Sequence, residues 1–386
     1  MPKAALVISS ALLVSLLSLA VACGGGEENP FEVQSELVTS AANPIAMAFA
    51  PDERLFYTEH STGNVRIVTP DGSLQEEPFA QVDVSAKFDW GLNGIALDPE
   101  FETNHYVYVS FTEPATTEAE RLAGVRIARP VVTRFTDVDG RGVDPEVIVG
   151  DLPETDPERG AFSAIGNIGF GPDGFLYIGM GDYDLFDPAQ DLSVAQGKIL
   201  RVDKEDGSAA PDNPFVDEAG ADPRIFAYGF RKAFNFDFHP ETGQMYATDH
   251  SGVTCDELNL IQAGANYGWP LAQEFRFGDC LEGQVTPPIY SFAPEGSMPM
   301  EPEAIVDPRG MRFLSGSAYP LLSGDSLLVC ELRTQLLRRL VLGGANLDQV
   351  VEDDIVVDDC GLDIAISPDG IIYYSTEKEI RRLVPQ

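Results

Sequence analysis

Residues 225–270 read IFAYGFRKAFNFDFHPETGQMYATDHSGVTCDELNLIQAGANYGWP. Within this stretch FNFDF alternates apolar and polar residues, as a strand with one buried face does. HPETG is typical of a turn, because Pro240 fixes φ and Gly243 can adopt φ > 0. QMYATD then has the composition of a returning strand. The stretch is therefore predicted to begin with a β-hairpin, and a polar loop follows it.

The same arrangement of an apolar strand, a tight turn and a strand rich in Tyr and Val occurs six times along the chain. A single hairpin leaves one face uncovered, so neighbouring copies must stack against one another. Six copies at unequal spacing, with insertions between them, predict an all-β protein, a six-bladed β-propeller. The turns of the six copies contain Pro51, Pro99, Pro172, Pro240, Pro320 and Pro368.

The two ends of the predicted propeller domain, residues 32–386, both look like strands. FEVQSELVT lies at its start and EIRRLVP near its end. Because a propeller must close into a ring, we expect these two segments to share one blade. The long segments 113–162 and 270–300 are expected to carry the loops of the top face, where binding residues usually lie.

The first residues have the pattern of an export signal. Lys3 precedes a long apolar run that ends in AVAC, with the cysteine at position 23. This pattern is typical of a secretory signal, and Cys23 favours a lipoprotein that is lipidated there. An ordinary signal peptide or a short membrane anchor is the alternative. The sequence thus predicts a signal over 1–23, a flexible tether over 24–31, and export to the periplasm or cell surface, with membrane contact through the lipid alone.

Composition excludes one class of partner and favours another. The formal net charge is −37. A nucleic-acid-binding protein needs a basic surface, so this class is excluded. A strongly acidic surface instead favours cations near the protein.

Four cysteines remain after Cys23, an even number that suggests two disulfides in an exported chain. We favour Cys255–Cys280 and Cys330–Cys360, because each pair closes a short loop of about 25 to 30 residues. Free buried thiols are the alternative. No CxxC or Cys/His spacing indicates zinc.

The loop after the hairpin of residues 225–270 contains several oxygen-bearing side chains. Asp256 and Glu257 stand side by side, and Tyr267 and Trp269 follow in NYGWP. Carboxylates, a phenol and loop carbonyls are ligands that calcium prefers. The alternative is that Asp256 and Glu257 cap the loop or pair with surface lysines.

This part of the chain resembles the glucose/sorbosone dehydrogenase family, the soluble PQQ-dependent aldose dehydrogenases. The family pattern is close to AYGxRN, HPETG, DE(L/I)N(L/I)I and GxNYGWP, and the corresponding segments here are AYGFRK, HPETG, DELNLI and GANYGWP. The resemblance covers nearly the whole chain after the signal. It implies the same six-bladed fold that the repeats predict.

The resemblance also implies a cofactor site over the central channel. PQQ, an anionic quinone, is held there by basic side chains, which correspond to Arg231, Lys232 and Arg333. Lys232 stands where the family has asparagine, and Asp89 stands where it has glutamine. The family's arginines near the last blade are lost near Cys360 and Leu362. Asp182 and Asp184 in GMGDYD are further candidate polar groups for a sugar or a metal.

Calcium positions follow from the same resemblance. Glu257 and Tyr267 match ligands of a structural calcium ion, and Asp256 adjoins them. The backbone carbonyls of Ser251 and Gly252 correspond to the site of the cofactor's calcium ion, which polarises the quinone. Gly252 stands where the family often has proline.

The family's catalytic histidine falls at Ser163, and a serine cannot act as a base unaided. A histidine suits this role because its pKa lies near neutrality. Three other residues are candidates for a displaced base: Asp89, His60 and His250. For the two histidines, the alternative is that they are ordinary polar loop residues.

Two functions remain open from the sequence. The first is an exported PQQ- and calcium-dependent aldose sugar dehydrogenase, an oxidoreductase that oxidises the C1 hydroxyl of a sugar to a lactone and passes electrons to an acceptor. The second is a calcium-stabilised propeller that has lost catalysis and binds a sugar, a glycan or a protein. A calcium-dependent lactonase with acidic channel ligands is a third reading, but the NYGWP pattern argues against it.

Overall fold

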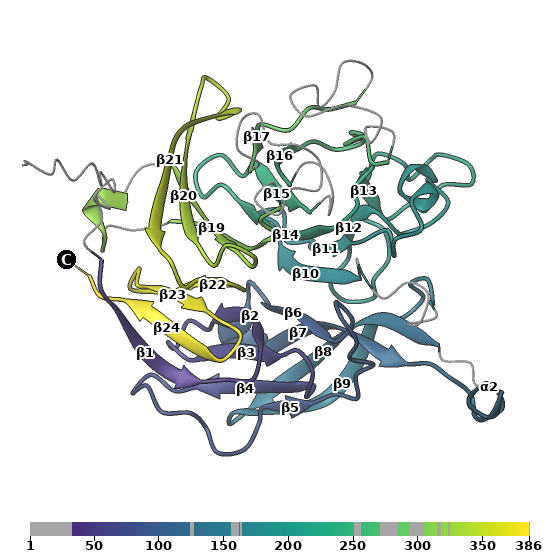
Figure 1. Cartoon of the computed structure of the whole chain (residues 1–386). Coiled ribbons are helices and arrows are strands. Elements are labelled where there is room, and N and C mark those ends of the chain that lie inside the picture. Colours follow the sequence, from purple (N-terminus) through teal and green to yellow (C-terminus); the bar gives the residue numbers. More distant parts are fainter. Residues whose placement is uncertain are drawn as a thin grey trace, which may run out of the picture. The chain divides into compact units, whose positions relative to one another are not determined.

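The computed structural model describes residues 33–123, 127–155, 162, 164–250, 256–270, 285–292, 305–314, 318–322 and 325–385. Phe31–Gln386 forms one compact unit. Within the described ranges, the strands form six antiparallel sheets of four strands each, arranged as a ring of blades (Figure 1). The predicted six-bladed β-propeller is confirmed. The described part of the chain has no helix that is long and apolar enough to cross a membrane.

Each blade uses four strands that are consecutive in the chain, except for the last. The first blade contains β2 (Pro44–Phe49), β3 (Leu55–Glu59), β4 (Asn64–Val68) and β5 (Ala80–Gln81). The second contains β6 (Leu92–Leu97), β7 (Tyr106–Pro114), β8 (Ala128–Val138) and β9 (Arg141–Val149). The third contains β10 (Ile165–Phe170), β11 (Leu176–Met180), β12 (Lys198–Val202) and β13 (Ile225–Tyr228).

The fourth blade contains β14 (Ala233–Phe238), β15 (Met245–Asp249), β16 (Glu257–Ile261) and β17 (Tyr290–Ser291). The fifth contains β18 (Pro308–Phe313), β19 (Ser326–Glu331), β20 (Leu337–Gly343) and β21 (Gln349–Val357). The sixth contains β22 (Ile364–Ile366), β23 (Ile372–Ser375), β24 (Glu379–Leu383) and β1 (Ser35–Ser40). Short helical turns are α1 (Phe101–Asn104), α2 (Glu118–Leu122), η1 (Asp187–Gln190) and η4 (Pro320–Leu322).

The six predicted hairpins are the first and second strands of the six blades. Each predicted proline lies in the connection between these two strands. Apolar side chains of adjacent blades then meet in shared clusters, as Tyr108 and Val132 of the second blade do with Ile178 of the third. Backbones approach closely as well, since a Cβ atom on Gly179 would lie 2.2 Å from the carbonyl oxygen of Ala233. Only glycine fits at that contact between the third and fourth blades.

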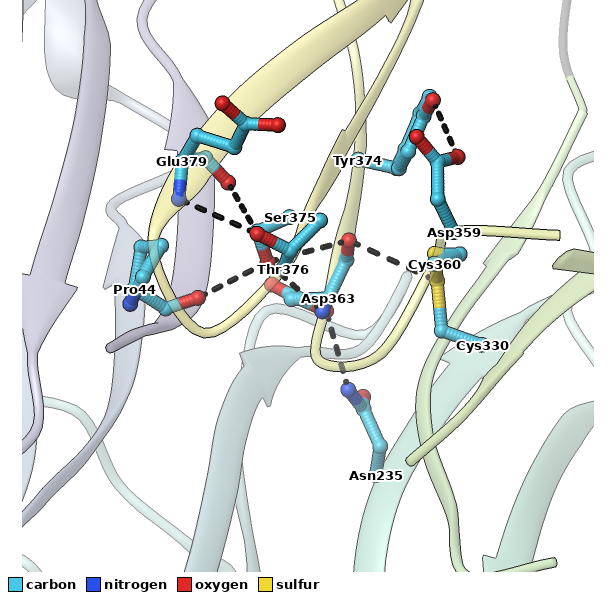
Figure 2. Close-up of a disulfide and its surroundings, with 10 residues drawn as sticks. All are labelled: Pro44, Asn235, Cys330, Asp359, Cys360, Asp363, Tyr374, Ser375, Thr376 and Glu379. Atoms are coloured by element: carbon cyan, nitrogen blue, oxygen red, sulfur yellow. Dashed lines mark hydrogen bonds between the residues drawn. A yellow bond between two sulfur atoms is a disulfide. The ribbon is translucent and has the colours of Figure 1, made fainter. Parts of the chain in front are cut away.

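The ring closes as predicted, by pairing the two ends of the chain. The first strand β1 runs antiparallel to β24, with Ser35 opposite Leu383, and Figure 1 shows the purple strand beside the yellow one. The hydroxyl of Ser375 donates a hydrogen bond to the carbonyl oxygen of Pro44 at 2.9 Å, as Figure 2 shows. Asp363 also accepts a bond from the amide of Met47 at 2.7 Å. These contacts join the sixth blade to the first.

Two segments expected to carry top-face loops have different outcomes. Residues 113–162 carry the connection from β7 to β8, which contains the short helix α2, and the segment that follows β9. Both start at the face where β7 and β9 end, as expected, while β8 and β9 themselves form the outer half of the second blade. Most of 270–300 lies outside the described residues.

One of the two predicted disulfides is present. Cys330, in β19, is bonded to Cys360, and the Cα atoms lie 5.4 Å apart (Figure 2). Both residues are fully buried. The bond links the fifth blade to the segment before β22, so it reinforces ring closure. Cys255 and Cys280 lie outside the described residues, so their pairing stays a prediction.

We expect the double variant Cys330→Ser/Cys360→Ser to lower the free energy of unfolding by about 3 kcal/mol, because the bond restricts the unfolded chain over a loop of about 30 residues. Urea unfolding followed by tryptophan fluorescence measures this loss. Under reducing conditions the wild type should lose at least as much as the variant, because the predicted Cys255–Cys280 bond would be reduced as well. A loss below about 1 kcal/mol would contradict the expectation.

Candidate functional site

The candidate site lies at the strand ends opposite the six proline turns. Each first strand begins there and each second strand ends there, because the turn between them occupies the other face. Arg231 and Lys232 directly precede β14, and His250 directly follows β15. Asp89 precedes β6, and Asp307 and Arg309 lie at the start of β18. The fold thus gathers residues from three blades that are far apart in sequence.

Three buried charged residues and the partly buried Asp89 meet at this face, and we call Asp89, Lys232, Asp307 and Arg309 the charged centre. Lys232 Nζ lies 2.8 Å from Asp89 Oδ2, and Arg309 Nη2 lies 3.4 Å from Asp89 Oδ1. Arg309 Nη2 also lies 2.8 Å from Asp307 Oδ2. Side-chain exposure is 2% for Lys232, 7% for Arg309 and 15% for Asp89. Buried charges persist only when paired, and here two cations balance two carboxylates.

Both cations of the charged centre lie over the face of one aromatic ring. Lys232 Nζ lies 5.0 Å from the ring centroid of Phe234, and the guanidinium carbon of Arg309 lies 4.7 Å from it. Cations over a ring face are attracted by its quadrupole, so Phe234 holds the two side chains close together.

The environment lowers the pKa values of two members of the centre, Asp307 and Lys232. Burial would raise the pKa of Asp307, but Arg309, His250 and Lys232 hold it well below its ordinary value. Burial lowers the pKa of Lys232, as does the charge of Arg309, although Asp89 and Asp307 oppose this. The carboxylate of Asp307 therefore stays ionised at neutral pH.

Arg231 forms a second ion pair next to the centre. Its Nη2 lies 2.8 Å from Asp184 Oδ1, and its Nη1 donates to the carbonyl oxygen of His250 at 3.1 Å. The backbone amides of Arg231 and Lys232 both donate to the carboxylate of Asp249, at 3.2 and 2.6 Å. Burial raises the pKa of Asp249 to about 6 despite these bonds. Asp249 thus fixes the backbone of the predicted cofactor-binding pair.

His250 is oriented by a buried carboxylate. Its Nδ1 lies 2.7 Å from Asp256 Oδ1. The other oxygen of Asp256 accepts hydrogen bonds from the amides of Val306 and Asp307, both at 2.8 Å. The carboxylate thus faces Nδ1 and fixes the orientation of the imidazole ring. The contacts of Asp256 match the alternative in which it caps the loop.

The other two candidate bases have less suitable surroundings. Both oxygens of Asp89 contact cations. Burial lowers the pKa of His60 to about 4, with only partial opposition from Asp89. His60 is therefore neutral at pH 7 and a weak base. Of the three, His250 has the geometry that a base requires.

The remaining predicted site residues are placed as follows. Glu257 lies opposite Asp249 in the sheet, and its Oε2 accepts a bond from Asn259 at 3.4 Å. The hydroxyl of Tyr267 donates to the carbonyl oxygen of Leu260 at 2.8 Å, and its ring stacks on Phe230. Ser163, Ser251 and Gly252 lie outside the described residues.

Arg333 is exposed, whereas Lys232 and Arg309 of the charged centre are buried. Its backbone amide donates to the carbonyl oxygen of Val306 at 3.0 Å. Among the described residues no three His, Cys, Asp or Glu side chains are grouped as a metal site. The calcium positions therefore stay predictions.

Asp182 and Asp184 shape a loop beside Arg231. Asp182 accepts bonds from the indole nitrogen of Trp269 at 2.7 Å and from the amide of Asp184 at 2.8 Å. Burial raises the pKa of Asp182. Tyr183, Asp184 and Phe186 all have positive φ, at 62°, 56° and 63°. Such strain in residues other than glycine gathers at functional sites.

Sequence reasoning missed Asp307 and Arg309. The sequence did contain a signal for them, because the segment DPRG places both charges at the start of the first strand of the fifth blade. Several buried polar atoms here have no hydrogen-bond partner within the described ranges: Asp307 Oδ1, Arg309 Nε and His60 Nε2. Buried polar groups are normally satisfied, so unsatisfied ones at one place indicate a ligand site.

Comparisons with known proteins identify the family of the chain. Residues 41–384 match the sequence profile of the Glucose / Sorbosone dehydrogenase family. The aldose sugar dehydrogenase YliI of Escherichia coli is 26% identical over 356 residues, which cover 89% of this chain and 89% of that protein. Quinoprotein glucose dehydrogenase B of Acinetobacter calcoaceticus is 29% identical over 257 residues, which cover 61% of this chain and 51% of that protein.

A solved structure extends the comparison to the fold. An oxidoreductase of Thermus thermophilus, described as a glucose dehydrogenase, superimposes with a TM-score of 0.76 at 30% identity. The match covers 91% of this chain and 100% of that one. Since the sequence match also spans almost the whole propeller, the chain belongs to the glucose/sorbosone dehydrogenase family.

Proposed function

We propose that this protein is an exported sugar oxidoreductase that uses PQQ and calcium to oxidise the C1 hydroxyl of an aldose to a lactone. The observation that carries the proposal is the convergence of Lys232, Arg309 and Arg231 at one face of a propeller of this family. Family membership and the similarity to a quinoprotein support the choice of cofactor.

The cations present fit an anionic quinone. PQQ carries three carboxylates, and charge-assisted bonds from lysine and arginine are the contacts such groups need. Arg309 Nε is buried without an acceptor within the described residues, so the centre can donate a further hydrogen bond. When bound, the quinone supplies the two-electron acceptor for the hydride of the sugar.

The chain's own residues position these groups. Phe234 holds Lys232 and Arg309 together, and Asp249 fixes the backbone of Arg231 and Lys232. Trp269 stacks against Phe186, with ring centroids 5.8 Å apart, and forms an apolar wall near Arg231. Such preorganised contacts help to bind and orient a planar ligand.

The calcium and export parts of the proposal rest on sequence. Glu257, Tyr267 and the carbonyl oxygens of Ser251 and Gly252 are the proposed calcium ligands, because oxygen atoms suit this ion. The apolar run that ends at Cys23 supports export to the periplasm or cell surface and a lipid anchor. The acidic composition, with a net charge of −37, is compatible with calcium binding.

A calorimetric titration of PQQ into the purified protein tests the function, first with calcium and then after chelation. We expect binding at micromolar affinity or tighter that weakens when calcium is removed. The absence of heat at millimolar cofactor, from protein shown to be folded by circular dichroism, would overturn the proposal. Release of a lactone from an aldose with an artificial electron acceptor then identifies the product.

A second candidate function is a propeller that binds a sugar or glycan without catalysis. It is favoured by one observation: both buried cations of the charged centre already pair with internal carboxylates. This function predicts sugar binding by the protein in the absence of PQQ. The calorimetric titration separates the two, because only the oxidoreductase requires the cofactor.

A further inference from the structure

Within the charged centre, one carboxylate of the protein contacts both cations. The carboxylate of Asp89 lies between Lys232 and Arg309, at 2.8 and 3.4 Å, and contacts one cation with each oxygen. A carboxylate of a bound anion that used the same two groups, Lys232 Nζ and Arg309 Nη2, would occupy the position of the Asp89 carboxylate. Asp89 and such a ligand therefore compete for one pair of donors.

The position of Asp89 results from a tight turn. Lys87 and Trp90 exchange two backbone hydrogen bonds, at 2.9 and 3.0 Å, so Phe88 and Asp89 occupy the tip. Phe88 has a φ of 55°, as the first tip residue of a tight hairpin turn requires. The tip directs the ring of Phe88 outward, where it is 59% exposed, and the carboxylate of Asp89 toward the cations.

The backbone of this turn is held firmly, whereas the carboxylate can rotate. Trp90 is fully buried, and Asn93 Nδ2 donates to the backbone carbonyl of Asp89 at 2.7 Å. The side chain of Asp89 is more exposed than that of either cation, at 15% against 2% and 7%. Rotation about the Asp89 side chain would therefore open the site while the turn stays in place.

We propose that Asp89 is a built-in competitor that occupies the carboxylate-binding position formed by Lys232 and Arg309 and must be displaced when an anionic ligand binds. The inference rests on the proposed function only for the identity of that ligand. Its chemical class is a molecule with more than one carboxylate, because a single carboxylate would merely replace Asp89. The competition lowers affinity for the anion and stabilises the centre when the anion is absent.

The variant Asp89→Asn tests this competition. It keeps the shape of the side chain but removes its charge, so PQQ should bind about tenfold or more tightly than to wild type. The thermal midpoint of the variant should be lower than that of wild type without anions, and succinate, a dicarboxylate that binds calcium only weakly, should raise it. Succinate should leave the wild-type midpoint nearly unchanged. Asp212→Asn, which neutralises a 74% exposed carboxylate, is the charge-matched control and should show neither effect.

The outcomes separate this inference from the proposed function. If succinate stabilises Asp89→Asn but neither protein binds PQQ, the competitor is supported and the quinone function is not. If both proteins bind PQQ equally well, the function stands and the competitor is overturned. If Asp89→Asn fails to fold, Asp89→Gln keeps an amide oxygen near both cations and serves in the same titrations, with the same outcomes.

Discussion

Replacing Asp307 by asparagine is expected to lower the free energy of unfolding at pH 7 by about 3–5 kcal/mol, because it leaves a buried guanidinium without its close partner. Arg309 Nη2 lies 2.8 Å from Asp307 but 3.4 Å from Asp89, so the remaining carboxylate compensates only in part. His250 loses a neighbouring negative charge in the same variant, since its Nδ1 lies 4.0 Å from Asp307 Oδ1.

The effect should depend on pH with a defined sign. The folded protein holds the pKa of Asp307 below its ordinary value of 3.8. A carboxyl of this kind stabilises the folded state above the unfolded pKa, and the stabilisation is lost as pH falls through the folded pKa. The difference between wild type and Asp307→Asn should therefore be largest above about pH 5 and shrink as pH falls below about 4.

Two other carboxyls act in the opposite direction and do not obscure this test. Burial raises the pKa of Asp249 and of Asp363 to about 6. Each makes the folded state less stable as pH rises from about 4 to about 6, because the folded state holds the proton more tightly. Both residues are present in wild type and variant, so their contributions cancel in the difference.

Urea unfolding at several pH values between about 2.5 and 7, monitored by tryptophan fluorescence, measures the difference. Asp151→Asn is the matched control, since Asp151 pairs with Arg224 but is 75% exposed. It should cost less than about 1 kcal/mol, as exposed ion pairs do. A cost for Asp307→Asn that is equally small, or that grows at low pH, would show that Asp307 does not stabilise Arg309.

The fold was predictable because its signals are local. Each hairpin combines a proline turn with strands on both sides, so residues within about 20 positions suffice to identify it. Closure by β1 and β24 followed from the requirement that the two ends of a propeller meet to complete one blade. The outer strands β8 and β9 were missed as strands because their segment lies between repeats and carries no hairpin of the repeated kind.

The charged centre was only partly predictable, because the fold alone brings its members together. Asp89 and Lys232 are 143 residues apart, and Asp89 and Arg309 are 220 apart. Resemblance to the family pointed to Arg231, Lys232 and Asp89. It gave no reason to choose Asp307 and Arg309, and nothing in the sequence showed that Asp89 would lie between two cations.

The prediction for Arg333 illustrates the same limit. A positive charge in the expected place in the sequence does not fix where the side chain lies. The amide of Arg333 bonds to Val306, and the chain turns soon afterwards at Gln335, which has a φ of 59°. The side chain is exposed, whereas Arg309 occupies the buried position beside Lys232.

Replacing Lys232 by methionine is expected to destabilise the protein by about 3 kcal/mol, since it removes the cation that lies 2.8 Å from the carboxylate of Asp89. The double variant Asp89→Leu/Lys232→Met should recover most of this loss, because a buried ion pair replaced by apolar residues of similar size is often neutral. Arg309 and Asp307 would remain as a balanced pair at 2.8 Å. Recovery of less than about 1 kcal/mol would mean that Asp89 and Lys232 do not interact strongly.

The same variants should separate stability from ligand binding. Relative to Asp89→Leu alone, the double variant should bind PQQ about 100-fold more weakly, because it lacks one charged donor to the cofactor's carboxylates. Relative to wild type the loss should be about tenfold, since removal of the internal competitor offsets part of it. Lys378→Met, at an exposed turn, is the charge-matched control and should bind like wild type. A stable double variant with unchanged affinity would place the cofactor's carboxylates away from Lys232, and Arg231 and Arg309 would then have to hold them.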